Sequence, residues 1–254
     1  MPLIDALKAG TPWPLRRLVR RVKTTISHVG QKPKSPQEVF TKIYTEGQWR
    51  APGSVEGTPD AFYSGPGSNV ATAIPYADCV NNFIRSHGVL SVVDLGCGDF
   101  RVGQHIAREP IHYVGVDVVE PLIRANQERY TADNVQFRCL DIIADELPKG
   151  ELCLVREVLQ HLSNEQILAI LPKLRKFRWV IVTEIQLAAA DAPKANRDKP
   201  HGAHTRVLWD SFVDLGAEPF SVPDMQLLLS VPGARSDDPR PVFINSFLIR
   251  NNAS

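Results

Sequence analysis

The chain has 254 residues, of which 43% are hydrophobic and 22% are charged, so it is long enough and apolar enough to bury the core of one α/β domain. The formal net charge is +1, which gives no strong attraction to nucleic acid, and we expect no nucleic-acid partner. No apolar run is long enough for a transmembrane helix and no signal peptide is evident, so we expect a cytoplasmic protein.

The first 35 residues differ from the rest of the chain in charge. Residues 1–35 hold eight lysines and arginines and one acid, Asp5. Leu15, Leu18, Val19 and Val22 interleave with the arginines. This pattern is typical of a basic amphipathic helix that binds a partner or a membrane surface, here the inner face of the membrane, and equally of a solvated tail. We therefore treat residues 1–35 as a separate N-terminal tail or helix.

Residues 36–89 form the second predicted unit. Hydrophobic spacing predicts helices over 36–48 and 70–87. The loop between them contains Ser64-Gly65-Pro66-Gly67-Ser68. Its glycines permit close approach, and its hydroxyl and amide groups could hold a ligand or form a lid, whereas the simpler alternative is a surface turn. We interpret this unit as N-terminal helices with a lid loop.

From residue 91 onward, strands and helices alternate. The predicted strands are 91–95, 112–117, 135–139, 151–156 and 179–184, with helices over 101–108, 120–130 and 164–176. Two further strands, 226–231 and 242–250, are predicted to pair as an antiparallel edge. The sequence therefore predicts an α/β three-layer sandwich with a mostly parallel, seven-stranded, Rossmann-like sheet over residues 90–254.

The end of the first of these strands carries the strongest functional signal. Asp94 precedes the turn Gly96-Cys97-Gly98, and Asp117 closes the next strand. Glycines let a ligand approach the backbone, and an acid at the second strand end can accept hydrogen bonds from a ribose. Arg101 stands where a dinucleotide fold would place a third glycine. Asp94 would repel a pyrophosphate, so the pattern favours a nucleoside cofactor with a cationic amino-acid end.

These motifs, over roughly residues 90–185, resemble the class I S-adenosylmethionine-dependent methyltransferases, in which an acid precedes G-x-G and a second acid closes the next strand. The resemblance implies S-adenosyl-L-methionine as cofactor. It also implies that Asp141 binds the adenine amino group and that Val118 or Ile142 flanks the ring. The cofactor-binding residues expected on this basis are Ser64, Gly65, Asp94, Gly96, Gly98, Asp117, Val118, Asp141, Ile142 and Arg156.

The segment Arg156-Glu157-Val158-Leu159-Gln160-His161-Leu162 follows the fourth strand, where the ligand crevice of such a sheet opens. A neutral imidazole at His161 could take a proton from a hydroxyl. Glu157 could orient that imidazole or act as the base itself. A satisfied core histidine is the alternative for His161. We predict that His161 and Glu157 are catalytic and that the site needs no metal, although Asp198, His201 and His204 could hold one.

Several of these features together resemble a bacterial group of methyltransferases associated with sugar and glycan methylation. They are the aromatic helix before the loop, the S-G-P-G-S sequence, Asp99-Phe100-Arg101 and Val158–Ser163. The resemblance implies methylation of a hydroxyl on a sugar, glycan or glycolipid, with His161 as general base. A small-molecule or protein N-methyltransferase and a non-catalytic cofactor-binding module are the alternatives. The expected acceptor contacts are Glu184, Gln186, Asn196, Arg197, Asp198, His201, His204, Arg206 and Phe220.

Overall fold

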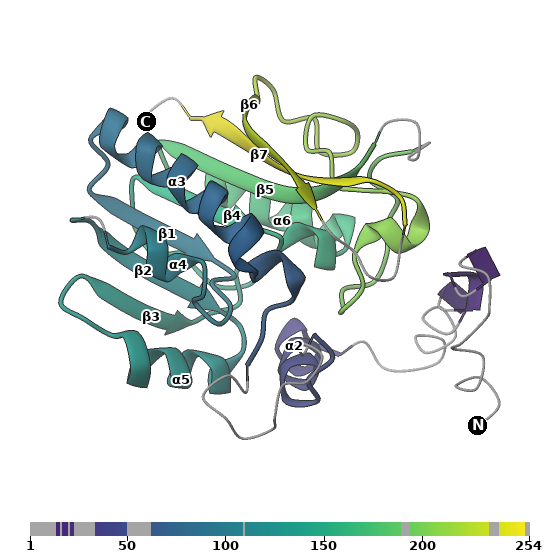
Figure 1. Cartoon of the computed structure of the whole chain (residues 1–254), viewed down its shortest axis with the longest axis horizontal. Helices are drawn as coiled ribbons and strands as arrows, with labels where there is room; N and C mark the ends of the chain where they lie inside the picture. The colour runs from purple at the N-terminus through teal and green to yellow at the C-terminus, as the bar shows by residue number, and fades with distance from the viewer. Residues whose placement is uncertain are drawn as a thin grey trace.

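The computed structural model describes residues 14, 15, 17–19, 21, 22, 34–49, 62–108, 110–188, 194–233 and 239–251. Its centre is a seven-stranded sheet with the strand order β3-β2-β1-β4-β5-β7-β6 (Figure 1). The strands are β1 Ser91–Leu95, β2 His112–Asp117, β3 Val135–Cys139, β4 Leu152–Arg156, β5 Trp179–Leu187, β6 Gln226–Gly233 and β7 Val242–Arg250. The first five are parallel, whereas β7 runs antiparallel to both β5 and β6. The predicted sheet is therefore confirmed.

The central strands are mostly apolar and buried because both faces of the sheet are covered. In β4, Leu152 to Val155 are all fully buried, and β1 is buried from Val92 to Leu95. From β1 the chain passes to β2 on one side, while β4 lies on the other side. This reversal of strand order opens a crevice at the carboxyl ends of β1 and β4.

Helices cover both faces of the sheet, which makes the predicted three layers. On one face lie α3 (Val70–His87), α4 (Gly103–Ile106) and α5 (Glu120–Tyr130), and on the other lies α6 (Asn164–Leu174) (Figure 1). The helix expected over 101–108 is shorter, because residues 99–102 form a turn in which the Asp99 carboxylate accepts the Arg101 N–H. The hydrophobic core is thus split by the sheet into two layers.

The helix α2 (Pro36–Thr45) lies at the carboxyl ends of the parallel strands, away from both covering layers (Figure 1). Ser35 and Glu38 form a capping box at its start, so its amino end is fixed by local sequence. Its buried Tyr44 packs with Leu122 of α5. The helix ends at Thr45 instead of the expected 48, and a turn follows in which Gln48 donates to the Ile43 carbonyl.

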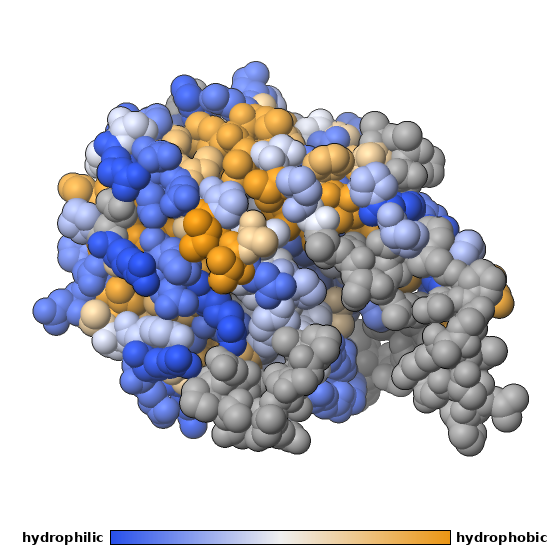
Figure 2. Space-filling model, in the orientation of Figure 1, coloured by the Kyte–Doolittle hydropathy of each residue, from blue (hydrophilic) through white to orange (hydrophobic). Residues whose placement is uncertain are grey.

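Three short 3-10 helices complete the described elements, η2 (Pro66–Ser68), η3 (Leu159–His161) and η5 (Arg206–Trp209). At the open edge of the sheet, Leu227 of β6 and Phe243 of β7 are exposed. Hydrophobic side chains gather over this part of the face in the space-filling view (Figure 2). No helix among the described residues is long and apolar enough to cross a membrane.

Most of the segment 1–35 lies outside the described residues. The residues described between 14 and 22 are helical, as one of the two sequence interpretations expects. The proposed boundaries at residues 36 and 90 stay predictions.

Candidate active site

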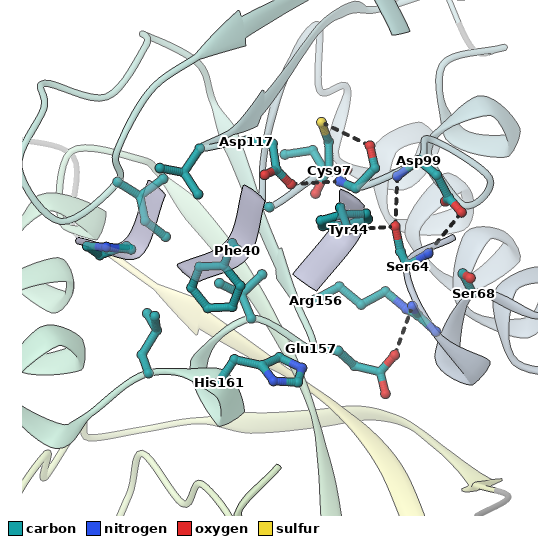
Figure 3. Close-up of a pocket in the computed structure, with 18 of the residues that line it drawn as sticks. Phe40, Tyr44, Ser64, Ser68, Cys97, Asp99, Asp117, Arg156, Glu157 and His161 are labelled. Atoms are coloured by element: carbon teal, nitrogen blue, oxygen red, sulfur yellow. Dashed lines mark hydrogen bonds and ion pairs between the residues drawn. The ribbon is translucent and has the colours of Figure 1, made fainter. Parts of the chain in front are cut away.

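A cavity opens at the carboxyl ends of the parallel strands (Figure 3). It is lined by α2, by the Ser64–Ser68 loop and by the turns that follow β1, β2, β3 and β4. The structure brings together eleven of the twelve predicted site residues: Ser64, Asp94, Gly96, Gly98, Asp117, Val118, Asp141, Ile142, Arg156, Glu157 and His161. Gly65 is outside the lining, because its φ of 95° and its carbonyl serve the turn that Ser68 closes.

Close contacts within the protein require glycine at two positions of the turn after β1. Gly96 has a φ of 77° and Gly98 a φ of 56°, a region that residues with a Cβ adopt at a cost. A Cβ on Gly98 would lie 2.3 Å from the Ser64 Oγ, and one on Gly96 would lie 2.3 Å from a Val158 methyl group. The turn is therefore packed between the lid loop and the segment that follows β4.

Asp117 joins the turns after β1 and β2. Its carboxylate accepts the Gly98 N–H at 3.1 Å and the Val119 N–H at 3.1 Å. Burial raises the pKa of this carboxyl to about 6, although both backbone hydrogen bonds favour the charged form. Val119 is the N-cap residue of α5, so the Asp117 carboxylate also holds the start of that helix. A second acceptor position on each oxygen remains chemically available to a ligand.

The lid loop is fastened to the glycine turn by Ser64. The Ser64 N–H donates to the Asp99 carboxylate at 3.0 Å, and the Asp99 N–H donates to the Ser64 Oγ at 2.8 Å. The Tyr44 hydroxyl lies 2.9 Å from the same Oγ. Ser64 and Asp99 line one side of the cavity, and Phe40 and His161 line the opposite side (Figure 3). The loop is thus a wall of the site.

Beside the glycine turn, a buried acid and a buried arginine line the cavity. Asp94 accepts a hydrogen bond from the Tyr113 hydroxyl, and burial raises the pKa of the Asp94 carboxyl to about 6. Arg156 donates to the Gly67 carbonyl at 2.7 Å and stacks over the Tyr76 ring at 5.0 Å. The cavity wall therefore carries an acid and a guanidinium group close to the glycine turn.

Glu157 lies under the lid loop. Its carboxylate pairs with the Arg156 guanidinium at 3.2 Å, and a Cβ on Gly67 would lie 1.6 Å from that carboxylate. Its φ of 57° places the backbone in the left-handed region, and its N–H donates to the Thr183 carbonyl at 2.7 Å. Glu157 therefore connects Arg156, the lid loop and β5.

The imidazole of His161 is oriented by a backbone carbonyl. Its Nδ1 lies 3.1 Å from the Gly202 carbonyl oxygen, which can only accept, so Nδ1 carries a hydrogen. The sequence suggested Glu157 for this orienting contact, and the structure gives it to a backbone carbonyl. The His161 ring packs 4.9 Å from Trp49 and edge-on, at 6.4 Å, to Phe40. The environment of this imidazole is aromatic.

Glu184 of β5 holds the short helix that carries His161. Its two carboxylate oxygens accept the Leu159 N–H at 2.8 Å and the Gln160 N–H at 3.1 Å. Burial raises the pKa of the Glu184 carboxyl to about 8, and the nearby charge of Glu157 adds to the shift. Glu184, Asn196 and Arg206 were expected to contact an acceptor, but all three are buried and hold neighbouring backbone groups.

The turn after β3 lines one end of the cavity. The Asp141 carboxylate accepts the Ile143 N–H at 2.9 Å, so the turn is shaped by its own acid. Leu140, Ile142 and Val118 give this end an apolar lining. No group of three potential metal ligands lies together within the part of the chain that the structure describes.

Four aromatic lining residues were not predicted as site residues, namely Phe40, Tyr44, Trp49 and Tyr76. Phe40 and Tyr44 are four residues apart, which puts them on one helix face. That spacing was visible in the sequence but is equally typical of a helix packed on a core. Only the position of α2 over the strand ends turns this face toward the cavity.

A family model matches the segment that contributes most of the residues lining this cavity. Residues 92–177 match a family model described as a methyltransferase domain. Over these residues the chain is similar to a methyltransferase domain. The matched residues include β1 to β4 and α6, and hence both acids, the glycine turn and His161. No curated protein matches the sequence significantly.

Solved structures show the same fold at low identity. This chain is similar to magnesium protoporphyrin IX methyltransferase (ChlM) from Synechocystis PCC 6803 with bound S-adenosylhomocysteine, at 15% identity and a TM-score of 0.52, covering 84% of this chain and 99% of that one. The N-terminal domain of EvdMO1, crystallised in the presence of S-adenosylhomocysteine and D-fucose, gives 16% identity and a TM-score of 0.51, covering 88% and 100%. At these identities the likeness describes the fold.

Proposed function

We propose that this protein is an S-adenosylmethionine-dependent methyltransferase that methylates a hydroxyl of a sugar, glycan or glycolipid, with His161 as general base. The observation that carries the proposal is the bond between the His161 Nδ1 and the Gly202 carbonyl, in the same cavity as the glycine turn. In the neutral form of the ring this bond assigns the lone pair to Nε2, at a site whose other residues suit a nucleoside cofactor.

The residues beside the glycine turn fit the amino-acid end of S-adenosylmethionine. The buried Asp94 carboxylate suits an ammonium group, because an adjacent cation would offset the burial that raises its pKa. The Arg156 guanidinium, which lines the cavity, suits a carboxylate. When bound, this cofactor supplies a methyl group on a positively charged sulfur, so the protein need only align and deprotonate the acceptor.

The remaining lining residues fit the nucleoside. Asp117 can accept hydrogen bonds from the ribose hydroxyls on the free acceptor positions of its carboxylate. Val118 and Ile142 offer apolar contact to an adenine ring, and Asp141 stands beside them for its amino group. Asp94, Asp117 and Asp141 can therefore accept hydrogen bonds from the ammonium group, the ribose and the adenine amino group of the cofactor, respectively.

Proton transfer is assigned to His161, and ordering of the site to Glu157. The lone pair on the His161 Nε2 can accept the proton of an acceptor hydroxyl as the new bond forms. Glu157 pairs with Arg156 and contacts the Gly67 loop, so we assign it to holding these two walls together.

The aromatic side chains near His161 support a carbohydrate acceptor. Phe40 and Trp49 lie beside the imidazole, and aromatic rings can pack on the apolar side of a sugar ring. The presence of D-fucose in one of the similar structures makes carbohydrates the first acceptors to test.

The experiment combines binding and turnover. The purified chain is incubated with labelled S-adenosylmethionine and fractionated cell-envelope glycans, and methylated products are identified by mass spectrometry. His161→Asn keeps a donor where Nδ1 lies but removes Nε2, so we expect unchanged cofactor binding and a turnover about 10²-fold or more lower. His112→Asn, at an exposed position at the start of β2, is the control.

Each other outcome points to one alternative. Full turnover by His161→Asn would refute the base assignment. Label found only on nitrogen would replace the hydroxyl acceptor by an amine. Cofactor binding without any product across sugar, lipid, protein and small-molecule acceptors would favour the non-catalytic module. Absence of binding to S-adenosylmethionine would sink the proposal.

A further inference from the structure

The helical residues described between 14 and 22 turn their arginines toward the body of the protein. Arg17 and Arg21 both form ion pairs with Asp210, and the Arg21 side chain also donates to the Leu208 carbonyl. Asp210 directly follows η5. The helical residues lie at the margin of the molecule in Figure 1. These contacts fix which side of the helix faces the protein.

A second side of this helix, next to the side that carries Arg17 and Arg21, is apolar and exposed. Leu15, Leu18 and Val22 are exposed to 48%, 55% and 48%. Their spacing of three and four residues places them on one stripe of a helix. An amphipathic helix on a globular protein normally buries such a stripe against the core, and here the polarity is reversed.

The sequence segment that contains the stripe is strongly basic. Residues 6–35 hold eight lysines and arginines and neither aspartate nor glutamate. The Asp210 carboxylate receives a third guanidinium group from Arg240. One carboxylate thus meets three positive side chains at the place where the helix is held. An exposed apolar stripe in a basic segment complements a surface that is apolar inside and anionic outside.

We propose that this helix docks the protein on an anionic lipid surface, with Leu15, Leu18 and Val22 entering the interface. The Asp210 contacts keep the stripe pointing away from the protein, so docking needs no rearrangement of the methyltransferase domain. The apolar contact and the charge attraction add, which is the combination that stable interfacial binding requires. The inference does not rest on the reaction assigned above.

The test is co-sedimentation of the full chain with lipid vesicles. We expect binding to vesicles of phosphatidylcholine mixed with phosphatidylglycerol, weaker binding to phosphatidylcholine alone, and weakening by salt. The double variant Leu15→Ser/Leu18→Ser should bind the anionic vesicles about tenfold less. The matched control is Leu90→Ser/Leu168→Ser, which replaces two exposed leucines elsewhere, at 64% and 43% exposure.

Three results would overturn the proposal. They are no binding to anionic vesicles, equal binding by the wild-type chain and the Leu15/Leu18 variant, and equal loss in the Leu90/Leu168 control. If the chain does not bind vesicles but self-associates through Leu15 and Leu18, the stripe is a contact surface for a second copy of the chain. Circular dichroism of each variant checks that the fold is retained.

Discussion

Ser64 and Asp99 exchange two hydrogen bonds although 35 positions separate them in the chain. Each residue uses its backbone N–H as donor and its side chain as acceptor. The pair closes the lid loop onto the turn after β1, and Tyr44 of α2 contacts the same Ser64 hydroxyl. The wall of the cavity is therefore held by a small polar network between segments that come before and after α3.

Removing the Ser64 hydroxyl tests this network. In Ser64→Ala, the Asp99 N–H and the Tyr44 hydroxyl lose their shared partner, and a buried group left unsatisfied costs about 1–3 kcal/mol. If the loop is needed for binding, the dissociation constant for S-adenosylhomocysteine should rise by about 5- to 100-fold in calorimetry. Ser86→Ala, at an exposed position of α3, is the control. A lower melting temperature with an unchanged dissociation constant would limit the network to stability.

Cofactor affinity should depend on pH through Asp94. Burial raises the pKa of the Asp94 carboxyl to about 6, above its ordinary value of 3.8. For the protein without ligand, this group contributes stability that is full below the ordinary pKa and is lost as the pH rises through 6. A cationic ligand favours the ionised form, so affinity should fall between about pH 7.5 and about pH 5.

Calorimetry across this pH range measures that dependence. Asp94→Asn should bind more weakly at neutral pH and show a flatter profile, because the titrating group has been removed. Asp133→Asn, at an exposed position before β3, should follow the wild-type profile. An affinity that stays constant for the wild-type chain from neutral to acidic pH would contradict the role of Asp94.

The stability of the protein should depend on pH through Glu184. Burial raises the pKa of this carboxyl to about 8 from an ordinary 4.5, so its contribution to stability is full below 4.5 and is lost as the pH rises through 8. Glu184→Gln should therefore flatten the fall in the free energy of unfolding over this range. Its amide would also face the Leu159 or Gln160 N–H, which should loosen the helix that carries His161 and lower kcat.

Urea titrations at several pH values separate the two effects. Glu151→Gln is the control, because Glu151 also accepts two backbone N–H groups, from Leu90 and Ser91. It does so near the surface, at the amino ends of β1 and β4. If Glu184→Gln and the wild-type chain lose stability in parallel with rising pH, the assignment is wrong.

The aromatic wall should act on the acceptor and not on the cofactor. Trp49 packs on the His161 ring and donates from its Nε1 to the Ala203 carbonyl at 3.2 Å. We expect Trp49→Ala to raise the acceptor KM by about tenfold while the cofactor dissociation constant stays within about twofold. Trp49→Phe keeps a ring and should lie between the two. A kcat loss with an unchanged KM would instead place Trp49 in the positioning of His161.

The sequence was informative where function depends on strand ends. The acid and glycine turn after β1 and the acid that closes β2 are short local patterns, and the parallel topology brings them together. The aromatic wall was not predictable in this way. Phe40 and Tyr44 have a spacing that any packed helix shows. Their place over the cavity depends on contacts with the segment after β2 and with Ser64, which are distant in the sequence.

Other differences have a local cause that composition does not reveal. The helix expected over 101–108 shortened because Asp99 is drawn into the turn by Ser64 and Arg101. Glu184 was expected among the acceptor contacts because it is a charged residue on β5 near the cavity. The two N–H groups of η3 occupy it instead, and no sequence pattern indicates that pairing.

The family match begins at Val92, whereas the cavity begins at α2. A recombinant fragment that starts at Val92 and runs to the end of the chain would keep nearly all of the sheet. It would lose α2 and the Ser64–Ser68 loop, which line one side of the cavity. It would also uncover the apolar sheet face that Val80 and Phe83 of α3 shield. Crystallisation or binding assays on such a truncation would examine an open, aggregation-prone remnant, so the residues from Ser35 onward belong in any minimal functional unit.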